Sequence, residues 1–169
     1  MMKDVLISAL QFLLLVIFQV FILDNIALSG YINPIVYIWF IILLPKGTAR
    51  WLVLLSSFAI GMCVDIFSGD IGVNALVCTF IGFLRLVLSN TFFENIDGEL
   101  KRPCIATQGL AKYLIYITTM VLTHRLLCLL IGTFAWAEFG QIMIKALIST
   151  IISVVFIVIL DMIFYAKKD

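Results

Sequence analysis

The sequence has few charged residues. Asp, Glu, Lys and Arg make up 12% of its 169 residues, whereas a soluble domain contains about a quarter. Hydrophobic residues make up 64%, and the mean hydropathy is +1.21. So few polar side chains cannot cover the surface of a water-soluble globule, and the sequence therefore predicts a protein whose solvent is lipid. The net charge is only +1, which gives no basic field of the kind that attracts nucleic acid.

The sequence also lacks the motifs of enzymes and of metal sites. It contains no GxSxG, HExxH, Walker or GxGxxG motif, so we predict no enzyme, no catalytic residue and no cofactor. The four cysteines, Cys63, Cys78, Cys104 and Cys128, form no CxxC and no zinc-ligand spacing. Three of them lie in apolar runs, which is typical of small buried side chains. A disulfide framework or a metal site is therefore not expected.

The apolar residues form six runs, and a helix needs about 20 such residues to cross a bilayer. The predicted spans are residues 5–23, 30–44, 50–67, 72–89, 113–133 and 142–165. The first run follows Lys3 and could be mistaken for a signal peptide. It is 19 residues long and no small-x-small cleavage site follows it, so a retained helix is favoured. We predict one all-α integral membrane domain, residues 1–169, built as a six-transmembrane-helix bundle.

The second run is the weakest of the six. Asn33 and Pro34 are typical of a helix start, and Pro45 ends the run. The residues between these prolines rise only about 16 Å as a helix. Either the helix begins earlier, near Ala27, or extended residues before Pro34 enter the membrane against other helices. The second arrangement requires protein to cover the backbone at that depth.

Basic residues predict the orientation, because most of them lie on alternate connections. These are Lys3, Lys46, Arg50, Lys101, Arg102, Lys112, Lys167 and Lys168. By the positive-inside rule, both termini and the connection 90–112 are predicted to be cytoplasmic. This connection is the only sizeable polar stretch. It is most simply a solvated loop, and a docking surface for a cytoplasmic partner around Lys101 and Arg102 is the alternative.

Apart from Arg50 at the very start of the third run, five charged residues lie inside the predicted spans: Asp65, Arg85, Arg125, Lys145 and Asp161. Each costs about 2.5–3.5 kcal/mol at mid-membrane on insertion scales, so such residues usually face the interior of a bundle. Their depths suggest two ion pairs, Asp65 with Arg125 or Lys145, and Arg85 with Asp161. Equally, Arg85 could reach the cytoplasmic interface, and Lys145 could reach the outer one.

Small and polar residues recur at helical spacing in two of the runs. Ser57, Gly61 and Asp65 share one face of the third run, and Asn74, Cys78, Gly82 and Arg85 share one face of the fourth. Small residues let helix backbones approach closely, and polar ones bond across helices. We interpret both faces as helix contacts within the chain, with a substrate path as the alternative.

Two further polar features are weaker. The only histidine, His124, is interpreted as a buried, hydrogen-bonded neutral side chain rather than as part of a proton relay. Asp65, Asp70 and Asn74 come close together in sequence where the third and fourth runs meet. Turn formation by Ser68, Gly69, Asp70 and Gly72 is enough to explain this cluster, and an external cation site is only a weak alternative.

Two stretches carry a resemblance to a known family. One is Gly30-Tyr31-Ile32-Asn33-Pro34, which leads to Leu43-Leu44-Pro45. The other is residues 61–76, with the pattern Gly-x3-Asp-x-Phe-x4-Gly-x2-Ala across two hydrophobic runs. Together with the length and the terminal basic cluster, they resemble MreD, the bacterial rod shape-determining family.

This resemblance implies a fold similar to the S components of energy-coupling-factor transporters. It also implies a non-enzymatic scaffold in the bacterial cytoplasmic membrane. The partners would be an MreC-like single-pass protein and, through the same complex, MreB, RodA and a class B penicillin-binding transpeptidase. The family offers no catalytic residues to carry over. Asp65, the one ionisable position in the matching pattern that we single out, is expected to matter for structure or for partner contact.

The alternative function is a small-molecule (vitamin) binding transporter subunit similar to an S component. It requires an outward-facing pocket with converging polar groups. Asp65, Asn74 and Arg125 are the residues that could supply some of these groups.

Overall fold

The structure, a computed structural model, describes residues 2–24, 34–69, 72–92, 102–133 and 139–165. Every regular element in these residues is helical, so the prediction of an all-α protein is confirmed. The elements are α1 (Met2–Phe18), the π-helical turn η1 (Gln19–Leu23), α2 (Ile38–Leu43), α3 (Arg50–Ser68), α4 (Val73–Phe92), α5 (Ile105–Gln108), α6 (Leu110–Thr133) and α7 (Phe139–Tyr165).

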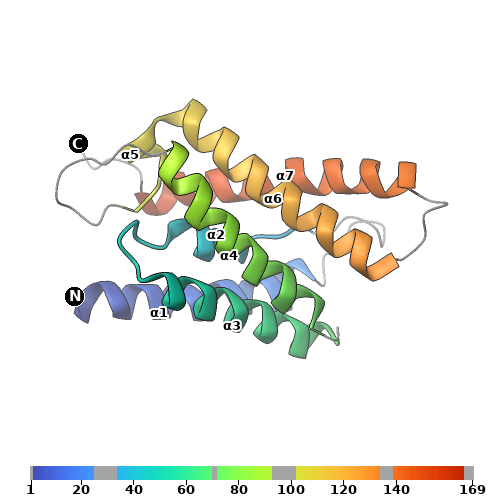
Figure 1. The fold of residues 1–169 in the computed structure, drawn as a ribbon, viewed down its shortest axis with the longest axis horizontal. Helices are drawn as coiled ribbons and strands as arrows, with labels where there is room; N and C mark the ends of the chain where they lie inside the picture. The colour runs from blue at the N-terminus through green and yellow to red at the C-terminus, as the bar shows by residue number, and fades with distance from the viewer. Residues whose placement is uncertain (1, 25–33, 70–71, 93–101, 134–138, 166–169) are drawn as a thin grey trace.

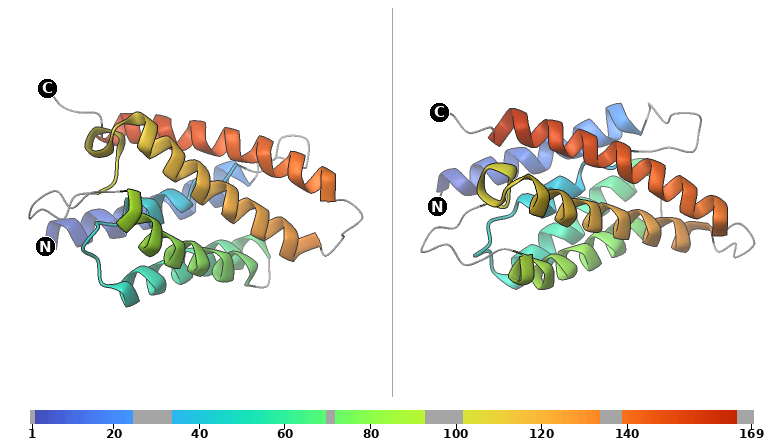
Figure 2. Two further views of the ribbon diagram at one scale, coloured as in Figure 1. Left: turned by 45° about the horizontal axis from the view of Figure 1, so that its top comes forward. Right: turned by 90° about the horizontal axis from the view of Figure 1, so that it is seen from above.

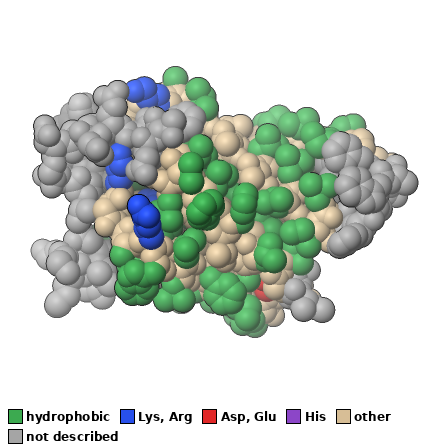
Figure 3. All heavy atoms as spheres, in the orientation of Figure 1, with side chains coloured by type: hydrophobic (Ala, Val, Ile, Leu, Met, Phe, Trp, Pro, Cys, Tyr) green, Lys and Arg blue, Asp and Glu red, His purple; other side chains and the backbone are tan. Residues whose placement is uncertain are grey.

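The long helices α1, α3, α4, α6 and α7 lie side by side around the short helix α2 (Figures 1 and 2). The start of α1, the turn between α2 and α3, α5 and the end of α7 all lie at one end of this bundle. Lys and Arg side chains gather at the same end (Figure 3), so we call it the basic end. The opposite end, which we call the distal end, holds η1, the end of α3, the start of α4 and the end of α6.

The outer surface of the bundle is apolar, as a lipid environment requires. Among the described residues, three helices are long and apolar enough to cross a membrane: Arg50–Ser68, Leu110–Gly132 and Met143–Tyr165. Ile7–Leu23 and Val73–Ser89 are shorter apolar helices. Large side chains such as Ile66 and Ile163 are about 70% and 69% exposed, and green hydrophobic atoms cover much of the visible face in Figure 3. A soluble monomer rarely exposes so much contiguous apolar surface. The apolar helices and their exposed apolar side chains therefore indicate a membrane protein.

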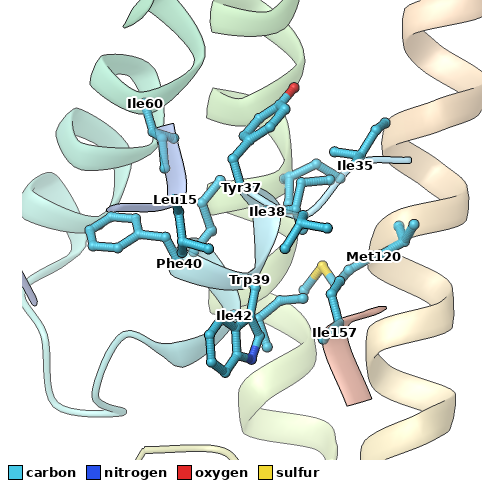
Figure 4. Close-up of a cluster of buried hydrophobic side chains, with 14 of the residues drawn as sticks. Leu15, Ile35, Tyr37, Ile38, Trp39, Phe40, Ile42, Ile60, Met120 and Ile157 are labelled. Carbon is cyan, nitrogen blue, oxygen red and sulfur yellow. The ribbon is translucent and has the colours of Figure 1, made fainter. Parts of the chain in front are cut away.

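The second predicted span differs from its prediction. Of its described residues, 34–44, Ile38–Leu43 are helical, and residues 34–36 have no regular secondary structure. Residues 34–44 are all buried, with α2 inside the bundle (Figure 4). Leu44 is extended at ψ 137°, the conformation that a following proline favours. The two alternatives for this run differ in residues 25–33, including Ala27, and these lie outside the described residues.

Candidate functional site

Residues 34–36, the non-helical stretch before α2, are held by polar side chains of two flanking helices. Ser153 on α7 accepts a hydrogen bond from the Ile35 N–H at 2.8 Å. Gln19 in η1 accepts one from the Val36 N–H at 3.0 Å and donates one to the Pro34 carbonyl at 3.0 Å. Backbone groups inside a membrane must be satisfied by protein. The Gln19 and Ser153 side chains satisfy these backbone groups, and neither residue was predicted from the sequence.

Asp65 sits at the end of α3 and caps the start of α4. Its Oδ1 accepts hydrogen bonds from the Asn74 N–H at 3.0 Å and from the Asn74 side-chain amide at 2.9 Å. Its Oδ2 accepts one from the Ala75 N–H at 2.8 Å. A carboxylate at a helix N-terminus satisfies free N–H groups and is favoured by the helix dipole. No hydrogen bond or ion pair joins Asp65 to Arg125 or Lys145, the predicted partners; the carboxylate bonds to the start of α4 instead.

The small residues of α3 and α4 face each other along the contact that leads to this cap. A Cβ on Gly61 would lie 2.5 Å from the Asn74 carbonyl oxygen and 2.6 Å from the Ala75 Cα. A Cβ on Gly82 would lie 2.5 Å from the Ser57 Oγ. The two predicted stripes therefore meet inside the chain, and the α3–α4 contact brings backbones together at a distance that only glycine allows.

Arg85 and Asp161, predicted as a pair, each bond to a helix end instead. The Arg85 guanidinium donates to the Leu44 carbonyl and, at 3.4 Å, to the Pro45 carbonyl, just past the C-terminus of α2. Asp161 Oδ2 accepts from the Ile105 N–H at 2.9 Å, at the start of α5. Arg85 is 1% exposed, so it does not reach the interface. Cations suit helix C-termini and anions suit N-termini, which explains both assignments.

A chain of polar groups leads inward from the Asp65 cap. Because the Asn74 amide donates to Asp65, its Oδ1 faces Tyr37 and accepts the phenol proton at 2.9 Å. The phenol oxygen lies 3.1 Å from His124 Nε2, which can then donate to it. His124 is fully buried, with Cys128 Sγ 3.6 Å from its Nδ1. It is thus a buried, hydrogen-bonded histidine, as interpreted from the sequence.

A cavity of about 520 Å³ lies at the distal end, beside this chain of polar groups. Its walls come from η1, the stretch before α2, α3, α4 and α6. Gln19, Asp24, Asn74 and Arg125 are the main polar groups of its lining. The volume lies in the range of small-molecule sites, which are mostly apolar with a few converging polar groups.

Arg125 on α6 is the unusual member of this lining. No hydrogen bond or ion pair joins it to another residue in the described part of the chain, and its buried Nε has no partner. It therefore differs from Asp65, Arg85 and Asp161, which all bond to helix ends. The structure places Arg125 on the wall of a cavity that Asp24 also lines, with an electrostatic attraction between the two but no hydrogen bond or ion pair.

No known protein-family model, curated protein or solved structure matches the chain. The resemblance to MreD therefore rests on the sequence patterns alone. Within the second pattern, Gly61, Asp65 and Ala75 all belong to the α3–α4 contact described above. Across the described ranges, no group of three or more His, Cys, Asp or Glu residues could hold a metal ion. Asp70, part of the weak cation-site hypothesis, lies outside those ranges.

Arg102 belongs to the connection predicted to be a cytoplasmic loop, with partner docking as the alternative, and its side chain bonds within the chain. Its Nη1 donates to Gln11 at 2.6 Å and to the Tyr165 hydroxyl at 3.2 Å, and its Nη2 donates to Ser8 at 3.0 Å. It thereby ties the segment before α5 to α1 and α7. Lys101 lies outside the described residues.

Proposed function

We propose that the chain is a non-enzymatic membrane scaffold of a bacterial cell-shape and elongation complex, similar in role to MreD. The observation that carries this proposal is the α3–α4 contact. The pattern that resembles the family, Gly-x3-Asp-x-Phe-x4-Gly-x2-Ala, supplies the close approach at Gly61 and the cap at Asp65. A pattern with a definite structural task is harder to attribute to chance than one scattered over the surface.

The proposed topology has six membrane passes in the bacterial cytoplasmic membrane, with both termini in the cytoplasm. The residues around α2 form the second pass, inside the bundle. The start of α1 and the end of α7 lie together at the basic end (Figure 1). Lys46, Arg50 and Lys112 belong to the elements at that end. The positive-inside rule places such an end in the cytoplasm.

The proposed contact with an MreC-like single-pass protein is the outer face of α7. The α3 and α4 stripes are buried against each other and are not open to a partner. On α7, exposed aliphatic residues recur every three or four positions and form one ridge. These residues are Ile144, Ile148, Ile151, Val155 and Ile159. A second membrane helix can pack along such a ridge through van der Waals contact. MreB, RodA and a class B penicillin-binding transpeptidase would join through the same complex.

Depletion of this protein from its native bacterium is expected to turn rod-shaped cells round, because the elongation complex would lose a membrane anchor. Phase-contrast microscopy of a depletion strain measures the length-to-width ratio. A wild-type copy supplied in trans should restore rods, and affinity purification in mild detergent should recover an MreC-like protein with it. Unchanged rods in a strain that lacks the gene entirely would refute the scaffold role.

The cavity favours a second candidate, a small-molecule binding subunit similar to an S component. Its volume of about 520 Å³ and its polar groups Asn74 and Arg125 are what such a site needs. Asp65, the third residue considered for this role, is committed to the α4 cap. A vitamin-sized ligand retained through purification would support this candidate over the scaffold.

A further inference from the structure

We propose that the distal cavity binds a phosphate group through Arg125. This site would lie between η1, α3, α4 and α6 and is separate from the α7 ridge. The proposal goes beyond the scaffold role and does not depend on it, because a scaffold and a transport subunit can both hold a phosphate ligand.

The first argument is the missing partner of Arg125. The fully buried charges among the described residues, Asp65, Arg85 and Asp161, each bond to a helix end. Arg125 has no such bond, and its Nε is buried. Charge inside a membrane bundle is costly unless it is paired. Asp24 lines the same cavity and attracts Arg125 electrostatically, but no hydrogen bond or ion pair joins these two residues. A ligand in the cavity can therefore supply the hydrogen bonds that the guanidinium group does not make to the described residues.

The second argument is the chemistry of the guanidinium group. It offers five N–H donors in a planar fork that matches phosphate oxygens two at a time. Asp24 also lines the cavity, and it accepts hydrogen bonds from Gln19 at 2.8 Å and from Ser68 at 3.3 Å. Its negative charge keeps an anion on the Arg125 side. In a phosphate ligand with a hydroxyl or amine substituent, the phosphate would accept hydrogen bonds from Arg125 and the substituent would donate one to Asp24.

The third argument is the apolar part of the wall. Phe21 from η1 and Phe67 from α3 line the cavity, and their ring centroids are 6.4 Å apart. They are 64% and 60% exposed on the surface that faces lipid. The lining is therefore continuous with lipid, where an acyl chain can lie. A lipid phosphate and a free phosphate share the chemistry that Arg125 would recognise.

The test uses the purified full-length chain in phosphatidylcholine nanodiscs. We measure its thermal unfolding midpoint after adding phosphatidylglycerol to the lipid, or inorganic phosphate to the buffer. Binding should raise the midpoint by on the order of 5 °C near saturation. A rise with phosphatidylglycerol alone identifies a lipid headgroup as the source, and a rise with inorganic phosphate identifies a free phosphate.

Two variants and one control locate the effect. Arg125→Gln should weaken the response at least about tenfold in the concentration required, with the basal midpoint unchanged or higher. Gly132→Phe should also remove the response, because Gly132 lines the cavity and a Cβ there meets nothing within 4 Å. Lys112→Gln, exposed at the other end of α6, should respond as wild type.

The proposal is overturned if neither phosphate source raises the wild-type midpoint. It is also overturned if Arg125→Gln and Gly132→Phe respond like the wild type, since the effect would then come from general surface charge. Should Arg125→Gln fail to fold, the Gly132→Phe response decides the question, because that substitution leaves the Arg125 side chain in place.

Discussion

Replacement of Gly61 by alanine is expected to lower the thermal unfolding midpoint of the purified protein by roughly 5–10 °C, based on overpacking costs of about 1–3 kcal/mol and a few degrees per kcal/mol. The new Cβ would lie 2.5 Å from the Asn74 carbonyl oxygen and 2.7 Å from the Ala75 nitrogen. Both atoms belong to the α4 backbone, so α4 itself must shift. That shift would also pull the Asn74 and Ala75 N–H groups away from Asp65. Circular dichroism or scanning calorimetry in detergent measures the loss.

Two other glycines provide controls for this substitution. Gly140→Ala places its Cβ in open space on α7, so we expect the same midpoint as wild type or a slightly higher one, from better helix propensity. Gly82→Ala meets only the Ser57 side chain within 3 Å, with Oγ at 2.5 Å and Cβ at 2.9 Å. Rotation of the serine side chain relieves the Oγ contact but not the Cβ contact, so its loss should be intermediate. If all three variants unfold at the wild-type temperature, the close α3–α4 contact is wrong.

Replacement of Asp65 by alanine is expected to reduce the folded protein in membranes several-fold. The substitution removes three hydrogen bonds, of 3.0, 2.9 and 2.8 Å, and leaves the first turn of α4 without a cap. Loss of a helix cap alone costs about 0.5–2 kcal/mol, and bonds to a charged group cost about 1.5–3 kcal/mol each. Fluorescence-detected size-exclusion chromatography of a fusion protein reports the monodisperse folded fraction.

Arg125→Ala is the matched control, because it separates the helix cap from the ion pair that the sequence suggests. An Asp65–Arg125 pair would make both alanine variants lose folded protein to a similar extent. The structure gives Arg125 no bond to a described residue, so its variant should accumulate at wild-type levels or above. Equal losses from the two variants would restore the ion pair and remove the argument for a phosphate at Arg125.

The sequence predicted the class of this protein well, because lipid as solvent leaves a strong mark on composition. Apolar runs, Gly61 and Ser57 at four-residue spacing, and a buried His124 all follow from local pattern and from the cost of polar groups in lipid. The contact between the small residues of α3 and α4 could also be predicted, since membrane helices usually approach each other closely through small residues.

The partners of the buried charges could not be predicted from sequence. Opposite charges at similar depth suggested ion pairs, whereas Asp65, Arg85 and Asp161 bond to helix ends. Asp65 bonds the start of the long helix α4, whereas the ends that Arg85 and Asp161 bond exist because α2 and α5 are short. The length of a helix inside a bundle depends on which neighbours satisfy its backbone. Gln19 was overlooked for a similar reason. The role of an amide side chain in an apolar run can be predicted only when the backbone groups that it bonds are known to lie beside it.

The central claim is that polar side chains hold residues 34–36, the buried, non-helical stretch before α2, in place. Hydrogen–deuterium exchange of the full-length protein in nanodiscs tests this directly at the Ile35 and Val36 amides. We predict slow exchange in the wild type, comparable with the core of α6, and faster exchange at Val36 in Gln19→Leu, which loses the 3.0 Å bond from that amide. Rapid exchange of both amides in the wild type would show that the stretch before α2 is open to water, and would contradict the account.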